Sequence, residues 1–592
     1  MSKLRRPSAS RTWLGLSLLF SLACSREVRR FPLAPPLWSD ADERPFAEQP
    51  GDYYSGIRAD AVDKFLLYPL SNIARIPRDG EALNVNALDE VPNSSWFQNR
   101  VGVFDYTPAQ IARAECGDTP ELDPANGKWL VVNAKPDGAN PGFFIEAPDG
   151  HRYLLKFDGK SQPLRASTAD VVGSKLYWAL GYHSVCNEVV YFQPDNLVME
   201  KGAITKTALG EKRPMTQDDI ATVLAQGFRL EDGRVRASAS RFVPGKPLGP
   251  FKYEDTRADD PNDVVPHEDR RELRAAHLPA AWINHIDARE QNTFDVVIEE
   301  RKRKFIRHYK IDWGDSLGIG FNPDRLARRF GYSYAIDFEQ MGQDLVSFGL
   351  LKRPWHDPHR SKVKIFGYYG VDGFVPSEWR GVYSIPAFSR RTPNDVSWMT
   401  RIMSRITDEH IRAIVARAKL PDERQSLYLE RVLIGRRDKF FEEYFSKYVP
   451  LSGFRMARRT PGETKQSLCF EDLGIQHGVS KAFETYYQLR FRGGLELERE
   501  LGWVQFMPDA KHPTWACVVL PLGDVRPAQL AGDRAYDDDP LRYGVMDLWV
   551  HQKPTVLPMG QVRLHFYDLG ESRGYRLVGI ERPREIRVPM DY

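Results

Sequence analysis

The stretch from Trp282 to Gly318 contains side chains that could bind magnesium and accept a proton. His285 and Asp287 form a His-x-Asp, Asn292 follows after four residues, and an Asp-x-Gly begins at Asp312. The residues between Asn292 and Asp312 have the pattern of a β hairpin with a charged turn, which would bring the two side chains together. Carboxylate and amide oxygens are ligands that Mg²⁺ prefers, and Asp287 could act as a base toward a hydroxyl. The pattern therefore indicates phosphoryl transfer from a nucleotide.

The same residues also have a structural interpretation. Asp287 could cap a helix, Asn292 could begin a turn and Asp312 could end a strand, and motifs this short arise often by chance. A metal-dependent hydrolase built on His285, Asp287 and Asp312 is a third interpretation. It ranks last because zinc sites usually contain more than one histidine. The elements upstream must decide between these interpretations.

A lysine upstream lies within a strand pattern. Lys156 belongs to YLLKFD, the last of three short apolar runs that predict a small antiparallel sheet (129–132, 142–146 and 153–157). A lysine inside such a run is costly to bury unless it is paired, so we expect it at a site or on a solvent-exposed face. The helix predicted over 167–180 follows this strand and carries Asp170 in its first turn. An acidic residue in the first turn would also suit the helix dipole.

The remaining elements predict an α+β fold. Before the His-x-Asp the sequence predicts a strand, a capped helix, a strand leading into Pro- and Gly-rich residues, and a charged helix (187–192, 216–226, 235–243 and 267–278). Beyond Gly318 it predicts two helices (407–419 and 421–448) and then β-type runs (503–507, 514–520, 545–550, 561–568 and 575–581). A small sheet is thus followed by a helical lobe and a separate antiparallel region.

The joint order of these parts, over about 129–318, resembles the protein-kinase-like superfamily, including its toxin-type and spore-coat-type branch. The resemblance implies a two-lobed domain that uses ATP and Mg²⁺. The site residues that it implies are Asp287, His285, Lys156 and Asp170 for catalysis, with Lys156 also on the nucleotide phosphates, and Asn292 and Asp312 for the metal. The sequence departs from the kinase pattern in three places. No Gly-x-Gly-x-x-Gly precedes Lys156, Asp170 is shorter than the usual Glu, and no Ala-Pro-Glu follows.

Length and composition predict a large folded protein. With 592 residues, 42% of them hydrophobic, the chain can bury an extensive core and is expected to form two domains. Its 83 basic and 80 acidic residues nearly balance, which gives no general case for nucleic-acid binding. The predicted parts are a signal peptide (1–23), a tether (24–52), a kinase-like domain (53–450, with a small lobe at about 125–245 and a helical lobe at about 250–450) and a β-rich accessory domain (451–592).

The N-terminal residues resemble a bacterial lipoprotein signal. Basic residues between Lys3 and Arg11 precede an apolar run over 13–22, and Ser21-Leu-Ala-Cys24 is similar to a lipoprotein cleavage site. Ser21 stands where such signals usually carry Leu, so ordinary secretion is an alternative. The resemblance implies that lipid on Cys24 anchors the chain in the cell envelope as an outer-membrane lipoprotein. The phosphate acceptor would be an unidentified protein, glycan or small molecule.

Four further cysteines allow disulfides. Cys116, Cys186, Cys469 and Cys517 are even in number, and three pairings are possible in an oxidising compartment. Buried free thiols are equally compatible with the sequence, although Cys469 and Cys517 belong to the same region and could pair.

Two classes of function follow from the sequence. The first is a membrane-anchored lipoprotein that transfers phosphate. The second is a non-catalytic binding or scaffold lipoprotein, or a pseudokinase, which the scarcity of ATP outside the cytoplasm favours. The deciding observation is whether Lys156, Asp287, Asn292 and Asp312 converge in space.

Overall fold

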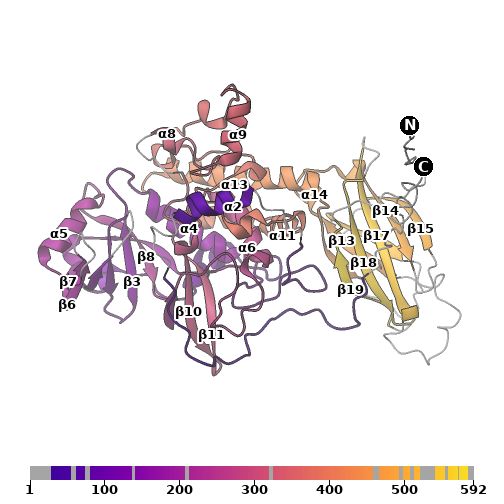
Figure 1. Cartoon of the computed structure of the whole chain (residues 1–592), viewed down its shortest axis with the longest axis horizontal. Helices are drawn as coiled ribbons and strands as arrows, with labels where there is room; N and C mark the ends of the chain where they lie inside the picture. The colour runs from indigo at the N-terminus through magenta and orange to yellow at the C-terminus, as the bar shows by residue number, and fades with distance from the viewer. Residues whose placement is uncertain are drawn as a thin grey trace, which may run out of the picture.

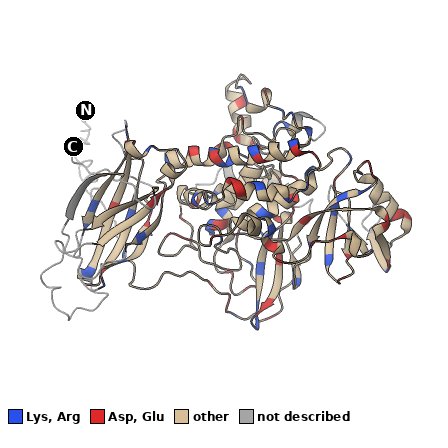
Figure 2. Ribbon diagram, turned by 180° about the vertical axis from the view of Figure 1, so that it is seen from behind, with Lys and Arg blue, Asp and Glu red and all other residues tan. Residues whose placement is uncertain are grey.

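The structure is a computed structural model that describes residues 29–54, 62–73, 80–135, 140–206, 212–318, 324–457, 466–492, 498–506, 513–520, 540–553, 558–570 and 573–583. Within these ranges the chain is a mixed α+β structure with four β-sheets (Figure 1). Basic and acidic residues are interspersed along its elements (Figure 2). Separate hydrophobic cores underlie the seven-stranded sheet, the helical region and the C-terminal sheets.

The predicted small sheet is confirmed and is wider than expected. Its strand order is β5-β8-β3-β2-β1-β6-β7. The bounds are β1 Trp129–Ala134, β2 Gly142–Glu146, β3 Arg152–Phe157, β5 Asn187–Phe192, β6 Leu197–Lys206, β7 Lys212–Pro214 and β8 Val235–Arg241. The sequence pattern misses β6 and β7 because β6 mixes charged with apolar residues and pairs with β1, a strand distant in sequence. Helix α5 (Gln217–Gln226) begins at the predicted cap, Thr216.

Helix α4 (Arg165–Ala179) follows β3, as predicted. Almost all of its residues are buried, polar ones included. It packs against β5 and β8 on one side and against the helical region on the other. This position between two layers explains why its sequence carries polar residues such as Asp170 on faces that are nonetheless closed to solvent.

Large aromatic side chains form the centre of the helical region. Trp282, Trp398 and Phe440 are completely buried. The helices are α2 Tyr68–Ile73, α3 Pro108–Arg113, α6 Arg271–Ala275, α7 His277–Ile283, α8 Asp324–Ala327, α9 Phe338–Val346, α10 Pro386–Ser389, α11 Pro393–Met403, α12 Asp408–Ala416 and α13 Glu423–Lys447. The charged helix predicted over 267–278 consists of a 3-10 turn (His267–Asp269) and α6, and α7 then restarts with Pro279 in its first turn, as the sequence also predicts.

The predicted hairpin between Asn292 and Asp312 is confirmed. Strand β10 (Thr293–Glu300) pairs with β11 (Arg303–Lys310) in antiparallel register, from Thr293 opposite Lys310 to Glu300 opposite Arg303. β9 (Lys246–Gly249) and β4 (His183–Ser184) complete a four-stranded sheet in the order β4-β11-β10-β9. This pairing brings Asn292, which precedes β10, close to the residues that follow β11.

Beyond residue 450 the chain forms two antiparallel sheets around a shared core. One contains β12 Leu451–Met456, β13 Gln466–Asp472 and β16 Trp515–Leu520, and the other β14 Thr485–Arg492, β15 Glu498–Gln505, β17 Tyr543–Gln552, β18 Gly560–Asp568 and β19 Tyr575–Glu581. The sequence analysis misses β12, β13 and β14. Strand β13 buries polar residues such as Gln466 and Asp472, which hides it from a hydrophobicity pattern. The short helix α14 (Leu473–Gln476) follows it.

The four cysteines of the folded region form two disulfides. Cys469 and Cys517 lie opposite each other on β13 and β16 and are bonded. Cys116, just beyond α3, is bonded to Cys186, which precedes β5. Both pairs of cysteines are therefore disulfides, and neither is a pair of free thiols.

The segment predicted as a tether contacts the folded body at several points of its described part. Phe31 is 4% exposed in a cluster with Tyr543 and Val578 of the C-terminal sheet. The Asp40 amide donates to the carbonyl of Asn93 at 2.8 Å. In Figure 1 this segment is the dark trace that runs between the C-terminal sheets and the β10–β11 hairpin.

The predicted signal peptide (1–23) and Cys24 lie outside the described residues. Among the helices of the described ranges, none combines the length and the apolar composition needed to cross a membrane. The lipid anchor at Cys24 stays a prediction.

Candidate active site

Lys156 joins two carboxylates from distant parts of the chain. Its Nζ lies 2.7 Å from Asp170 Oδ2 and 2.9 Å from Asp312 Oδ1, and the residue is 4% exposed. Burial alone would lower the pKa of Lys156, but the two carboxylates outweigh it and the pKa is raised. The lysine is therefore a fixed cation between β3, α4 and the end of β11, and the expected Lys156–Asp170 pair is confirmed.

Asp170 also holds the Asp-x-Gly segment in place. Its Oδ1 accepts a hydrogen bond from the Trp313 amide at 3.0 Å, and its Oδ2 accepts one from Ser238 Oγ at 2.7 Å. With Lys156 these bonds give the buried carboxylate three donors, which offset its desolvation. Asp170 therefore couples the lysine strand directly to the segment that contains Asp312.

A glycine explains why the shorter Asp reaches where a Glu is usual. Gly173 lies one turn after Asp170 on α4, and a Cβ at this position would overlap with the buried indole of Trp313. The missing side chain lets α4 approach the Asp-x-Gly segment closely. The side chain of Asp170, one methylene shorter than that of Glu, can therefore reach the Asp-x-Gly segment.

Asn292 and Asp312 meet at the open end of the β10–β11 hairpin. The Ile311 amide donates a hydrogen bond to the Asn292 carbonyl at 3.0 Å. Asp312 directly follows Ile311, so its backbone lies next to that of Asn292. Asn292 Nδ2 donates to the Asp287 carbonyl at 2.6 Å and to Asp287 Oδ2 at 3.2 Å. Because the amide nitrogen is committed to Asp287, Oδ1 is the atom through which Asn292 could ligate a cation.

Asp312 has the conformation and exposure of a ligand. Its backbone is left-handed, with φ of 54°, and its side chain is 40% exposed although Lys156 and the Gly314 amide (3.3 Å) both bond to Oδ1. Burial acts to raise the pKa of Asp312, but Lys156 and Lys135 overcome this and lower it. The ionised carboxylate and the Asn292 amide are hard oxygen donors, and this donor set fits Mg²⁺.

Asp287 lies beside these groups. Its Oδ1 is 3.1 Å from Arg289 Nε, and its side chain is 16% exposed. Burial raises the pKa of Asp287 to about 7, with Arg289 opposing the change and the carboxylates of Asp315 and Asp312 adding to it. A carboxyl group with this pKa can exchange a proton near neutral pH.

His285 is enclosed by the protein. It is 3% exposed and packs edge-on to Tyr177, with ring centroids 6.2 Å apart. Burial lowers the pKa of His285 to about 4, so the ring is neutral at pH 7. At this position it can support the loop that carries Asp287, and it is closed off from any substrate.

Three further residues of the site escape the sequence analysis. Lys135, directly after β1, donates to the Asn140 carbonyl at 3.1 Å, and burial lowers its pKa against the attraction of Asp312. Asn140 lies over the Asp-x-Gly, since a Cβ on Gly314 would be 3.2 Å from its Nδ2. Asp315 is half-buried beside Asp287 and Asp312. The second Asp of Asp-Trp-Gly-Asp is a sequence signal for Asp315, but Lys135 and Asn140 carry none.

The hydrolase interpretation receives no support from the geometry. Within the described ranges, the one set of three His, Cys, Asp or Glu side chains whose ligand atoms lie within 4.8 Å of one another is Cys116, Cys186 and Glu188. Its two sulfurs are joined in a disulfide and cannot act as thiolate ligands.

Comparison with known proteins gives weak likenesses. No family model and no curated protein matches the chain. Among solved structures it is similar to the "Crystal structure of the golgi casein kinase", with 10% identity and a TM-score of 0.26 over 59% of this chain and 85% of that chain. A second, the "crystal structure of the Golgi casein kinase with Mn/ADP bound", has 9% identity and a TM-score of 0.25 over 58% and 84%. Because these TM-scores are low, the proposed function rests on the geometry of the site.

Proposed function

We propose that the chain is a phosphotransferase with a two-lobed, kinase-like domain that uses a magnesium nucleotide. The observation that carries this proposal is the position of Lys156, 2.7 Å from Asp170 and 2.9 Å from Asp312. A buried lysine between a helix carboxylate and a metal-binding aspartate is the arrangement with which kinases position nucleotide phosphates. A buried ion pair of this kind is costly to build for stability alone.

Each residue of the site has a proposed task. Bound Mg²⁺ would neutralise charge on the phosphates, and Asn292 and Asp312 would hold it through their side-chain oxygens. Lys156 would bind the phosphates, with Asp170 keeping its ammonium group in position. Asp287 would orient the acceptor hydroxyl and take its proton, while Arg289 and Asn292 hold the Asp287 carboxylate.

A pseudokinase or scaffold is the second candidate. The observation that favours it is that Lys156 already has two carboxylate partners and Asp170 has three donors, so the network is satisfied by the protein itself. In this case the network would hold the two lobes together, and nucleotide would have no effect.

The test is whether Lys156 contributes to nucleotide affinity. We expect Mg²⁺ and ATP to raise the melting temperature of the wild type. We expect Lys156→Met to weaken Mg-ATP binding about 10- to 100-fold in titration calorimetry, because it removes charge-assisted hydrogen bonds worth about 1.5–3 kcal/mol. Lys128→Met is the matched control, since Lys128 is an exposed lysine at the start of the same sheet and pairs with Asp195 at 3.1 Å. A wild type whose melting ignores millimolar Mg-ATP would contradict the proposal.

The lipoprotein anchor belongs to the same proposal. We expect Cys24→Ala to move the protein from the membrane fraction to the soluble fraction, because lipid on a single cysteine would be removed. Ser25→Ala, the neighbouring substitution, should leave the distribution unchanged. Fractionation and mass spectrometry of the N-terminal peptide measure both results, and an unmodified Cys24 in the wild type would show that the signal was misinterpreted.

A further inference from the structure

A buried lysine lies against one of the two disulfides. Lys175 of α4 is 1% exposed, and its Nζ lies 3.9 Å from Sγ of Cys116. Burial lowers the pKa of Lys175 to about 7, against the attraction of Glu188. A disulfide sulfur is a weak hydrogen-bond acceptor and compensates a buried ammonium group poorly. The cluster therefore places a cation beside a sulfur that carries no charge while the disulfide is intact.

Reduction of this disulfide would give Lys175 a better partner. Cys186 is half-buried, whereas Cys116 is 3% exposed, so the sulfur that an external dithiol can reach is that of Cys186. Attack by its thiolate forms a mixed disulfide with Cys186 and breaks the bond to Cys116, whose sulfur leaves with the electron pair as a thiolate beside Lys175. A neighbouring ammonium group lowers the pKa of a thiol and makes it a better leaving group.

The second thiol of the dithiol completes the reduction. It displaces Cys186 from the mixed disulfide, so that the dithiol is oxidised to a disulfide and the protein is reduced by two electrons. The two protons of the dithiol balance the two cysteine sulfurs that are released.

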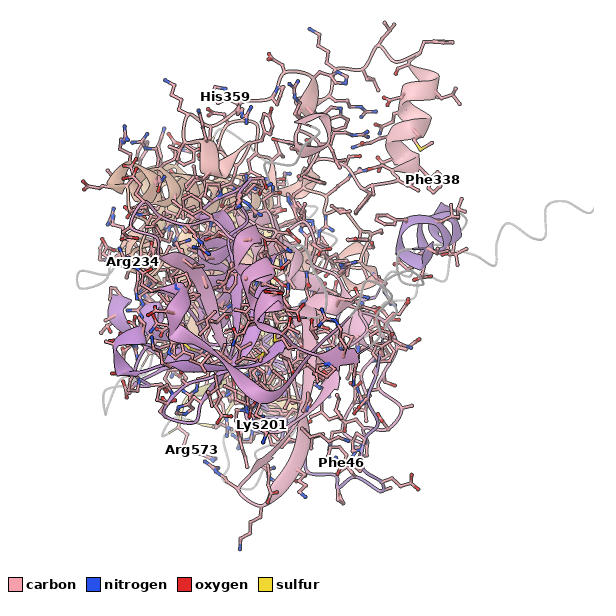
Figure 3. The ribbon with its side chains drawn as sticks, turned by 90° about the vertical axis from the view of Figure 1, so that its left-hand side faces the viewer. Phe46, Lys201, Arg234, Phe338, His359 and Arg573 are labelled. Carbon is pink, nitrogen blue, oxygen red and sulfur yellow. A yellow bond between two sulfur atoms is a disulfide. The ribbon has the colours of Figure 1, made fainter. Side chains whose placement is uncertain are left out.

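The disulfide also holds two segments against α4. Helix α4 lies between the helical region and the seven-stranded sheet, which faces the viewer in Figure 3. The 3-10 turn Ala114–Cys116 packs on α4, and Cys186 directly precedes Asn187. Asn187 Nδ2 donates to the Asp170 carbonyl at 3.1 Å, and Asp170 is the partner of Lys156 in the proposed site. The covalent bond therefore lies one residue away from a contact that positions Asp170.

Reduction would change the packing around α4. Two thiols need more room than two bonded sulfurs, so Cys116 and Cys186 would move apart. The carboxylate of Glu188 lies within 4.8 Å of both sulfurs and would repel a thiolate. Helix α4 is buried along almost its whole length, and a close-packed interior transmits such displacements. The change would therefore reach Asp170.

We propose that the Cys116–Cys186 disulfide is a redox switch that holds α4 in place when oxidised and releases it when a dithiol reduces it. Release of α4 would loosen the Lys156–Asp170 pair and lower the affinity for the magnesium nucleotide, and this consequence rests on the proposed phosphotransfer. The other disulfide, Cys469–Cys517, joins neighbouring strands of the C-terminal region and is an internal reference.

The rate of reduction tests the role of Lys175. The parent protein carries Cys24→Ala and is treated with dithiothreitol, and alkylation with peptide mass spectrometry gives the rate at each disulfide. We expect Lys175→Met to slow reduction of Cys116–Cys186 about 3- to 10-fold, because the leaving thiolate loses its cation, and to leave Cys469–Cys517 unchanged. Lys201→Met is the control, since Lys201 is an exposed lysine of β6, labelled in Figure 3. An equal or faster rate in Lys175→Met would overturn this role.

Hydrogen exchange tests the release of α4 without nucleotide. A Cys469→Ser, Cys517→Ser variant of the parent keeps Cys116–Cys186, and we expect dithiothreitol to speed exchange over 165–179 at least about tenfold and reoxidation to restore it. A Cys116→Ser, Cys186→Ser variant should exchange fast with or without dithiothreitol. Melting temperatures show whether both variants are folded, and either one suffices. Exchange that ignores the state of this disulfide would overturn the switch.

Titration with Mg-ATP separates the switch from the proposed function. We expect the reduced protein to bind Mg-ATP at least about fivefold more weakly than the oxidised protein. Equal affinity in both states would overturn regulation of the site by the disulfide and leave phosphotransfer standing. Binding in neither state, together with faster exchange of α4 on reduction, would overturn the nucleotide proposal and support the switch.

Discussion

Replacing Asp312 with alanine is expected to remove magnesium-dependent nucleotide binding while the protein stays folded. Lys156 keeps its partner Asp170 at 2.7 Å, and the Asp312 side chain is 40% exposed, so no buried charge is left unpaired. The loss of one hydrogen-bonded partner should cost about 1 kcal/mol of unfolding free energy. Groups that merely support a metal ligand typically contribute 10- to 100-fold to affinity, so the ligand itself should contribute at least about 100-fold.

Melting with and without Mg²⁺ and ATP measures both effects at once. Asp149→Ala is the control, because Asp149 is an aspartate 58% exposed in the β2–β3 turn, away from the site. The control should keep the nucleotide-induced shift of the wild type, and Asp312→Ala should lose it. If Asp312→Ala instead lowers the melting temperature strongly and the wild type never responds to nucleotide, the scaffold interpretation is correct.

Gly173→Ala should destabilise the protein although it adds only one methyl group. The added Cβ would overlap with the Trp313 indole, which is completely buried. Overpacking typically costs about 1–3 kcal/mol, and here it would exceed the gain of up to about 1 kcal/mol that alanine brings to a helix. The strain would also separate Asp170 from the Trp313 amide, so nucleotide binding should weaken in parallel.

Gly342→Ala provides the matched comparison. Gly342 is likewise a glycine inside a helix, α9, but a Cβ there meets no atom within 4 Å. It should therefore stabilise α9 by up to about 1 kcal/mol through helix propensity alone. Chemical denaturation of both variants against the wild type gives the difference. Equal behaviour of the two would mean that the contact between Gly173 and Trp313 does not limit the approach of α4.

Much of the local structure follows from the sequence. The strands around Lys156, the helix that carries Asp170 and the β10–β11 hairpin each have a local signal, which is a run of apolar residues, a helical repeat or a turn of fixed type. Hydrogen bonding within a hairpin also fixes the relative position of its ends, so the meeting of Asn292 with Asp312 could be predicted. Strand β6 could not, because its partner β1 is set by parallel pairing across the sheet.

Contacts between distant segments required the tertiary structure. Lys156 and Asp312 are separated by 156 positions, and no periodicity relates their side chains. Asn140 lies over Gly314 and Lys135 donates to the Asn140 carbonyl, contacts that no local pattern predicts, whereas Asp315 directly follows the Asp-x-Gly. The sequence by itself thus determined which residue types could bind a nucleotide and a metal, since short-range spacing fixes those. The tertiary structure decided which of them meet, which are buried like His285, and that Gly173 lets an aspartate take the place of a glutamate.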